Sequence, residues 1–248
     1  GAMMAGTTES YSTEELSGEL EKLGSSINVY AGNEEIVVNV SSLTKNIDAT
    51  LALLEEVMMK PKFTEDEYNR LKFSQLESIA NQVNEPTTLA NNQFDKVLYG
   101  EGHIMAIPSA GTEATLGGVT LTDVQEFYEA NFAPNISNLV VVGDIEKDAI
   151  LGKLAFLKSW EKKEVTYPTE PATPAAGVTK IYLVDKPGAA QSEVRLGYLS
   201  MPFDVTGDYY KAKLMNFNLG GNFNSRINQD LRENKGWTYG TYTYFSGS

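Results

Sequence analysis

A proline-rich stretch at residues 164–177 constrains the fold of this 248-residue chain more than any other feature. It holds Pro168, Pro171 and Pro174 among threonines and alanines, and its apolar residues follow no helical or strand period. Such a composition is typical of an extended linker. We therefore predict a first unit over residues 1–163 and a second over residues 178–248. Because the second unit is short for a domain with its own core, we expect it to be truncated.

Helical signals dominate the first unit. Ser12 and Glu15 have the spacing of a capping box, and Gly24 follows as a C-terminal stop. Thr64 and Glu67 repeat the capping-box spacing at the start of a longer helix. The predicted helices cover residues 12–24, 46–60, 64–84, 88–98, 121–132 and 147–160, and residues 208–219 and 225–235 in the second unit.

Short apolar runs predict β-strands in both units. Residues 26–30 and 35–40 alternate apolar and polar side chains around Gly32-Asn33, which favours an antiparallel hairpin with one buried face. The continuous apolar run 139–142 is typical of a fully buried strand. Further strands are predicted at residues 180–184, 193–200 and 237–245. These elements predict an α/β (α+β) fold in which antiparallel-rich mixed sheets have helices packed on one face.

The composition excludes several classes of function. The chain has 20 Lys+Arg against 33 Asp+Glu, a formal net charge of −13 that repels phosphate backbones, so we expect no nucleic-acid partner. Its longest strongly apolar runs are far shorter than the ~18–20 residues that cross a bilayer, so we expect no membrane span. The lack of cysteine excludes disulfides, thiolate nucleophiles and cysteine-based zinc sites.

His103 is the only histidine, so a two-histidine metal motif cannot form within one copy of the chain. Any general-base mechanism that uses imidazole would have to run through this residue. It lies in the glycine-rich segment 100–104 without a serine motif nearby, which favours a histidine that packs a loop. We predict no catalytic residue and no metal ligand in this chain.

The most specific motif lies near the C-terminus. Residues 219–226 read Leu-Gly-Gly-Asn-Phe-Asn-Ser-Arg, and residues 231–240 read Leu-Arg-Glu-Asn-Lys-Gly-Trp-Thr-Tyr-Gly. We interpret Gly220-Gly221 as a tight turn. Gly236 stands where a helix C-cap needs a positive φ, which places Arg232 in the last helical turn and Tyr239 early in the next strand. By spacing alone, Arg232 stabilises the helix dipole and Tyr239 packs in the core.

This pattern resembles the insulinase/pitrilysin family of zinc peptidases, which includes the mitochondrial processing peptidases. Further runs resemble the same family in order along the chain: Gly6-Thr7, residues 12–24, Asn28-Val29-Tyr30-Ala31, Leu98-Tyr99-Gly100 with His103, Gly111-Thr112, Phe127-Tyr128 with Asn131-Phe132 and Pro134, and residues 140–144. The resemblance covers most of the chain. It implies metallopeptidase-like repeat units, of which the first lacks its N-terminal strands and its metal-binding helix.

The zinc motif of that family is missing here. Members bind one zinc through an inverted HxxEH motif and a downstream glutamate, and the metal activates water. This sequence contains no HxxEH. Glu77 lies near the position of the third ligand, and without two histidines we interpret it as an ordinary helix residue. The resemblance therefore implies no cofactor in this fragment, with zinc in the intact parent or its partner where that is active.

The resemblance also implies a role for two residues. In the family, an arginine and a tyrosine seven residues apart contact the substrate backbone from the half opposite the zinc. Arg232 and Tyr239 match both residue types and the spacing. The leading hypothesis is a non-catalytic part of an insulinase-like zinc metallopeptidase that forms chamber wall and peptide-binding surface. The alternative is a structural or assembly subunit of the same fold with no proteolytic role.

The expected partners follow from that hypothesis. They are a peptide substrate and a catalytic domain or subunit that carries HxxEH. Because incomplete units leave sheet edges exposed, a homo-oligomer of the fragment is a further alternative. We expect a periplasmic or secreted location, with a cytoplasmic location as the alternative.

Overall fold

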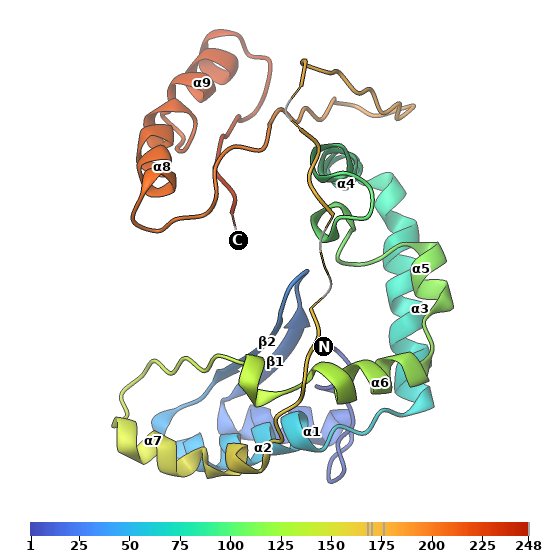
Figure 1. Cartoon of the computed structure of the whole chain (residues 1–248), viewed down its shortest axis with the longest axis vertical. Coiled ribbons are helices and arrows are strands. Elements are labelled where there is room, and N and C mark those ends of the chain that lie inside the picture. The colour runs from blue at the N-terminus through green and yellow to red at the C-terminus, as the bar shows by residue number, and fades with distance from the viewer. Residues whose placement is uncertain (168, 170, 176, 248) are drawn as a thin grey trace. The chain divides into compact units, whose positions relative to one another are not determined.

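A computed structural model describes residues 1–167, 169, 171–175 and 177–247, and the chain divides into two compact units, Gly1–Arg195 and Leu196–Ser248 (Figure 1). Pro168 of the predicted linker lies outside the described residues. The division falls between Arg195 and Leu196, beyond the end of the predicted linker at residues 164–177, and the unit bounds drawn from the sequence stay a prediction.

The first unit is mostly helical (Figure 1). Its helices are α1 (Thr13–Leu23), α2 (Ile47–Met59), α3 (Glu65–Asn81), α4 (Pro86–Tyr99), α5 (Glu113–Gly118), α6 (Leu121–Asn131) and α7 (Lys147–Lys153), and its strands are β1 (Ser26–Ala31) and β2 (Ile36–Ser41). The two strands pair antiparallel, with Ser26 opposite Ser41 and Ala31 opposite Ile36. This hairpin confirms the prediction made around Gly32-Asn33.

The predicted ends of α1 are confirmed by its caps. The Ser12 side chain accepts a hydrogen bond from the Glu15 N–H, and the Glu15 carboxylate accepts one from the Ser12 N–H at 2.9 Å. Gly24 ends the helix with φ +59°, a conformation that favours glycine. These local interactions require no distant partner, which is why the sequence alone predicts them.

The core of the first unit forms between α1, α2, the hairpin and the segment around α7. Helix α2 is buried on more than one side, because Leu51, Leu54 and Met58, which recur at spacings of three and four, are joined by Leu53 and the fully buried Val57. The buried Thr50 hydroxyl lies 2.8 Å from both the Ser25 and the Ser42 hydroxyl oxygens, which ties the open end of the hairpin to α2.

The α+β class with an antiparallel sheet is confirmed, in a helix-rich form whose only sheet among the described residues has two strands. The strand predicted at residues 139–142 is wrong: Val140 and Val142 are 80% and 93% exposed. The predicted strands at residues 180–184, 193–200 and 237–245 are likewise not strands. An apolar run becomes a buried strand only beside another strand that pairs with its backbone, and no described segment pairs as a strand with any of these four runs.

Two further differences lie between the predicted helices. Helix α5 was not predicted and lies between the predicted helices 88–98 and 121–132, where Thr112 and Thr115 cap it reciprocally. Helix α3 has no buried residue among those described, and Val83, which the predicted helix 64–84 included, lies beyond its end and is 54% exposed.

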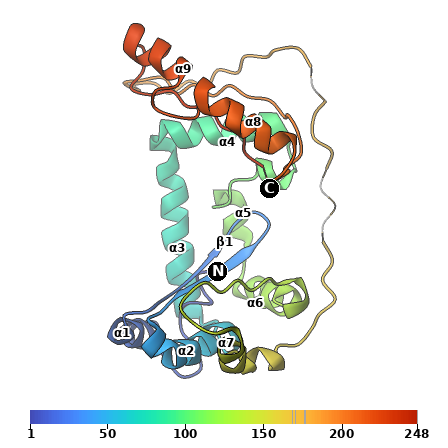
Figure 2. The same cartoon turned by 90° about the vertical axis from the view of Figure 1, so that its left-hand side faces the viewer.

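The second unit contains α8 (Asp208–Leu219), the short α9 (Arg226–Asn228) and a π-helix, η6 (Gln229–Asn234). Its C-terminal segment runs back alongside α8 (Figure 2). Asn216 of α8 donates to the Thr243 carbonyl at 2.7 Å and accepts from the Thr243 hydroxyl at 2.5 Å. The Tyr209 hydroxyl donates to the Phe245 carbonyl at 2.9 Å. Side chains of α8 therefore hold a segment that pairs with no strand.

Tyr128 of α6 gives the first unit a dependence on alkaline pH. Its hydroxyl donates to the Met58 carbonyl at 2.6 Å, and its ring packs against Phe63 and Phe132. Burial raises the pKa of the Tyr128 phenol to about 12. Because the folded state favours the neutral phenol, its stabilisation is complete below pH ~10 and is lost as the pH rises through ~12.

We therefore expect Tyr128→Phe to destabilise the chain most at pH 8 and least near pH 12. Urea unfolding of both proteins at pH 8, 10 and 11.5 measures the difference in free energy of unfolding. Titration of other groups affects both proteins equally and cancels in this difference. A difference that stays constant from pH 8 to 11.5 would contradict the expectation.

Candidate functional site

Arg232 lies in the π-helix η6, and the glycine that ends this element has the predicted conformation. The Lys235 N–H donates to the Asp230 carbonyl at 3.1 Å, a spacing of five residues. Gly236 follows with φ +63°, which confirms the conformation predicted for it. Single π-helical turns are rare and frequently occur at functional sites.

The structure brings Arg232 and Tyr239 together. The Arg232 guanidinium carbon lies 5.3 Å from the centre of the Tyr239 ring, within the range of a cation–π interaction. Tyr239 is 89% exposed, so it does not pack in a core as its spacing alone suggested. The Arg232 side chain is 26% exposed and pairs with the Glu233 carboxylate at 2.9 Å. The pair thus lies at an accessible surface of the second unit.

Phe223 covers Arg232 as well, a contact that sequence reasoning missed. The guanidinium carbon lies 4.5 Å from the centre of the Phe223 ring, closer than to Tyr239. The two residues are nine positions apart, and a turn, helix α9 and the first residues of η6 lie between them. No local pattern predicts such a contact, although Phe223 stands inside the glycine-rich run that the sequence singled out.

Asn228 joins the segments that carry the two rings. It is 1% exposed, its amide donates to the Phe223 carbonyl at 2.7 Å, and its side-chain oxygen accepts the Thr241 N–H at 2.8 Å. Thr241 lies two residues after Tyr239. One buried amide therefore fixes the backbone next to both aromatic residues.

The glycine pair before this site allows a close approach of the chain. A side chain at Gly220 would lie 2.1 Å from the Thr243 hydroxyl oxygen, and one at Gly221 would lie 2.9 Å from the Phe217 Cα. The Thr243 N–H donates to the Gly220 carbonyl at 2.9 Å. Gly220-Gly221 therefore serves packing in a turn, in agreement with the interpretation as a tight turn.

The arrangement can bind a planar acceptor. A guanidinium presents N–H donors in its plane, and the rings of Phe223 and Tyr239 lie within cation–π range of it. A carboxylate or a peptide carbonyl can accept hydrogen bonds from those in-plane donors. The exposed Tyr239 phenol adds a further donor and acceptor beside it.

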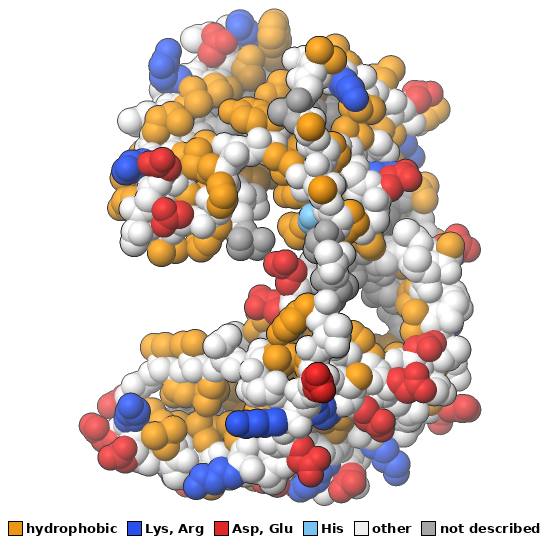
Figure 3. All heavy atoms as spheres, in the orientation of Figure 1, with side chains coloured by type: hydrophobic (Ala, Val, Ile, Leu, Met, Phe, Trp, Pro, Cys, Tyr) orange, Lys and Arg blue, Asp and Glu red, His pale blue; other side chains and the backbone are white. Residues whose placement is uncertain are grey.

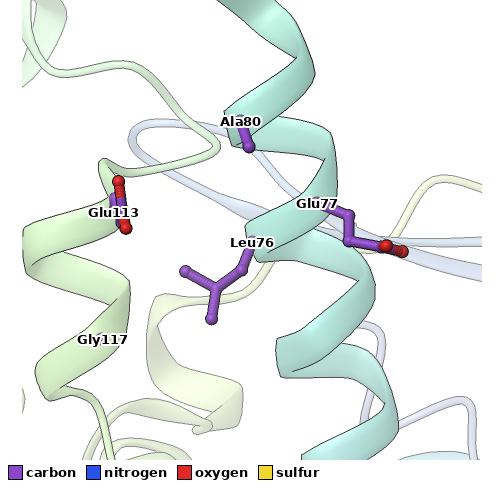
Figure 4. A pocket seen from close by; sticks show the side chains of 5 residues that line it. All are labelled: Leu76, Glu77, Ala80, Glu113 and Gly117. Carbon is purple, nitrogen blue, oxygen red and sulfur yellow. The ribbon is translucent and has the colours of Figure 1, made fainter.

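The two other residues considered from the sequence form no metal site. The His103 ring stacks on Tyr99 with centres 5.3 Å apart, and its Nδ1 accepts the Met105 N–H at 3.1 Å. Glu77 belongs to α3 and, with Glu113 of α5, lines a shallow pocket (Figure 4). Figure 4 shows the Glu77 carboxylate pointing away from Glu113. Across the part of the chain that the structure describes, no three His, Cys, Asp or Glu side chains gather to hold a metal ion.

Comparison with protein families identifies the chain. The profile named insulinase (peptidase family M16) matches residues 2–105, and the profile named peptidase M16 inactive domain matches residues 118–248. The chain belongs to peptidase family M16. The inactive-domain profile covers all of the described site around Arg232, and the resemblance inferred from the sequence motifs is confirmed.

Curated M16 relatives carry contrasting names. The chain is 25% identical over 243 residues to a protein named uncharacterized zinc protease YmxG from Bacillus subtilis, which covers 96% of the chain and 57% of the relative. It is 24% identical over 226 residues to a protein named non-peptidase homolog YmxG from Helicobacter pylori, which covers 90% of the chain and 51% of the relative. The chain thus spans little more than half the length of these relatives.

Solved structures share the fold. A crystal structure of a peptidase M16 inactive domain from Pseudomonas fluorescens has a TM-score of 0.79 at 24% identity, and covers 99% of this chain and 60% of the other. A protease from Helicobacter pylori has a TM-score of 0.76 at 17% identity, and covers 98% and 59% respectively. At this identity the likeness establishes the M16 fold.

None of the helices formed by the described residues is long and apolar enough to cross a bilayer.

Proposed function

We propose that this chain is a non-catalytic part of an M16 zinc peptidase and binds peptide through Arg232 and Tyr239. The observation that carries the proposal is the contact between these two side chains at an accessible surface. They lie in the region that matches the M16 inactive domain. A charged donor beside an exposed phenol suits a peptide backbone, which offers carbonyl acceptors along its length.

Each residue has a distinct part in the proposed mechanism. The Arg232 guanidinium donates to a peptide carbonyl next to the scissile bond and favours the negative charge that develops there. The Tyr239 hydroxyl donates to the same carbonyl or to its neighbour. A zinc ion would activate water for attack, but the described residues of this chain do not offer the ligands for one. That ion therefore belongs to a domain or subunit with HxxEH.

A structural or assembly role is the second candidate. The name of the Helicobacter pylori relative, non-peptidase homolog, favours it. So does the surface of the second unit, where hydrophobic side chains gather over α8 and α9 (Figure 3). Tyr210, Leu214 and Phe217 are each at least 50% exposed and recur at spacings of four and three along α8. Such a face suits a protein partner, which could be a second copy of the chain.

For the location of the protein, we propose the periplasm or the extracellular space.

Peptide binding by the whole chain tests the proposal. Fluorescence anisotropy with fluorescein-labelled casein peptides measures the affinity of the parent chain and of Arg232→Ala. Loss of a charged hydrogen bond of ~1.5–3 kcal/mol is expected to weaken binding about 10- to 150-fold. Arg226→Ala, which removes an exposed arginine of α9, is the matched control and should bind as the parent does. Equal affinities of the two variants would refute the peptide-binding role.

A further inference from the structure

We propose that Phe223 and Asn228 are positioning residues that hold the Arg232 guanidinium ready for an acceptor. The inference rests on the proposed peptide-binding function and extends its site from two residues to four. The geometry that points to it is the pair of cation–π contacts that Arg232 makes with Phe223 and Tyr239, together with the buried amide of Asn228. Neither Phe223 nor Asn228 needs to touch the peptide in this role.

Phe223 restricts the arginine side chain. An arginine loses considerable conformational freedom when it binds a partner, and less is lost when its plane is already held. The Phe223 ring is the nearer of the two rings to the guanidinium, at 4.5 Å against 5.3 Å for Tyr239. Tyr239 is 89% exposed while Phe223 is 53% exposed. The Phe223 ring therefore has less freedom to move and restricts the guanidinium more than Tyr239 does.

The loop that carries Phe223 is itself fixed on both sides. Asn222 donates its amide to the Phe217 carbonyl at the end of α8, and its side-chain oxygen accepts the Asn224 N–H at 2.8 Å. Asn228 then accepts the Thr241 N–H at 2.8 Å while donating to the Phe223 carbonyl at 2.7 Å. The buried amide therefore fixes the distance between the Phe223 loop and the Tyr239 segment.

This geometry predicts which acceptors the site takes. The N–H donors of a guanidinium lie in its plane, and the Glu233 carboxylate oxygen lies 2.9 Å from Nη1, which shows that this edge already attracts an oxygen acceptor. Arg232 is therefore set to receive a planar acceptor edge-on, such as a peptide carbonyl or a carboxylate. A lysine would keep the charge but lose the planar fork of N–H donors, so Arg232→Lys should not restore binding.

The contact between Phe223 and Arg232 is tested by nuclear magnetic resonance on the whole chain. The Arg232 Nε–Hε resonance is assigned by its loss in Arg232→Ala, and ring currents should shift it upfield of the Arg226 resonance. Phe223→Leu should move it back towards the Arg226 position, and Phe223→Trp should restore the shift. Phe217→Leu, which changes an exposed phenylalanine of α8, is the matched control and should leave the resonance in place.

Peptide affinity is measured on the same variants with fluorescein-labelled casein peptides. Loss of one cation–π support is expected to weaken binding about two- to fivefold in Phe223→Leu, with recovery in Phe223→Trp. Asn228→Asp keeps the acceptor for Thr241 and removes the donor to Phe223, and should act in the same direction as Phe223→Leu. If Asn228→Asp does not fold, the Phe223 variants decide.

The outcomes separate the two proposals. A resonance that does not respond to Phe223→Leu, while Arg232→Ala still weakens binding, would overturn the positioning role alone. A resonance that responds as expected, while Arg232→Ala leaves the affinity unchanged, would overturn the peptide-binding function on which the inference rests. Recovery of both the shift and the affinity in Phe223→Trp would support both.

Discussion

Truncating Leu16 to alanine is expected to lower the free energy of unfolding of the chain by about 2–5 kcal/mol. Leu16 of α1 is 3% exposed and belongs to the cluster that α1 shares with α2 and the hairpin. The substitution removes buried apolar surface and leaves a cavity that the capped helix cannot easily close. Because stabilities of domains are themselves about 5–15 kcal/mol, this is the largest expected effect on folding.

A second leucine provides the control for that measurement. Leu151 is also helical and lies in α7 of the same unit, but it is 52% exposed. Leu151→Ala should change the free energy of unfolding by about 0.5 kcal/mol or less. Urea denaturation followed by far-ultraviolet circular dichroism measures both variants. Equal losses for Leu16→Ala and Leu151→Ala would mean that the α1–α2 cluster is not the core of this unit.

The elements that the sequence predicted well are those fixed by neighbouring residues. Helix α1 begins after Ser12 and ends before Gly24 because both caps are made within four residues of the helix ends. Helix α8 covers residues 208–219 as predicted. The hairpin register follows from the turn and from alternation along two adjacent runs. In each case the interactions that decide the structure are local.

The strands failed because their formation depends on a neighbour. Residues 139–142 carry four apolar side chains in a row. This pattern indicates that burial would be favourable, but it does not show whether a neighbouring strand exists. Val142 remains 93% exposed because no strand lies beside it among the described residues. The residues of one segment therefore do not predict whether a second strand lies beside it.

The candidate site was predicted in part, for a related reason. The family motif supplied Arg232 and Tyr239, whose types and spacing are visible in the sequence. The supports of Arg232 come from nine residues before it and from a buried asparagine whose two bonds reach Phe223 and Thr241. No sequence pattern around Asn228 predicts that its side chain bonds to these two distant backbone groups. Family resemblance therefore located the site, and the structure supplied its architecture.

The second large effect concerns catalysis in an assembly that provides the zinc-bearing HxxEH domain. Arg232→Ala there is expected to lower peptidase turnover about 10²–10³-fold, the usual cost of removing one donor to a developing oxyanion. Tyr239→Phe removes the phenol donor and should lower turnover in the same direction. Because Tyr239 is 89% exposed, its substitution should change the free energy of unfolding by less than ~0.5 kcal/mol.

The measurement pairs steady-state turnover with melting temperature for each variant. Arg226→Ala removes an exposed arginine of the same charge from the same unit, and should leave both quantities near those of the parent. A drop in turnover without a drop in melting temperature would place Arg232 and Tyr239 on the substrate. Unchanged turnover, or a loss that follows a large fall in melting temperature, would leave the arginine as a cation at a helix end and the tyrosine as its cation–π partner at the surface. The structural or assembly role would then account better for this chain, because the exposed apolar face of α8 requires no substrate.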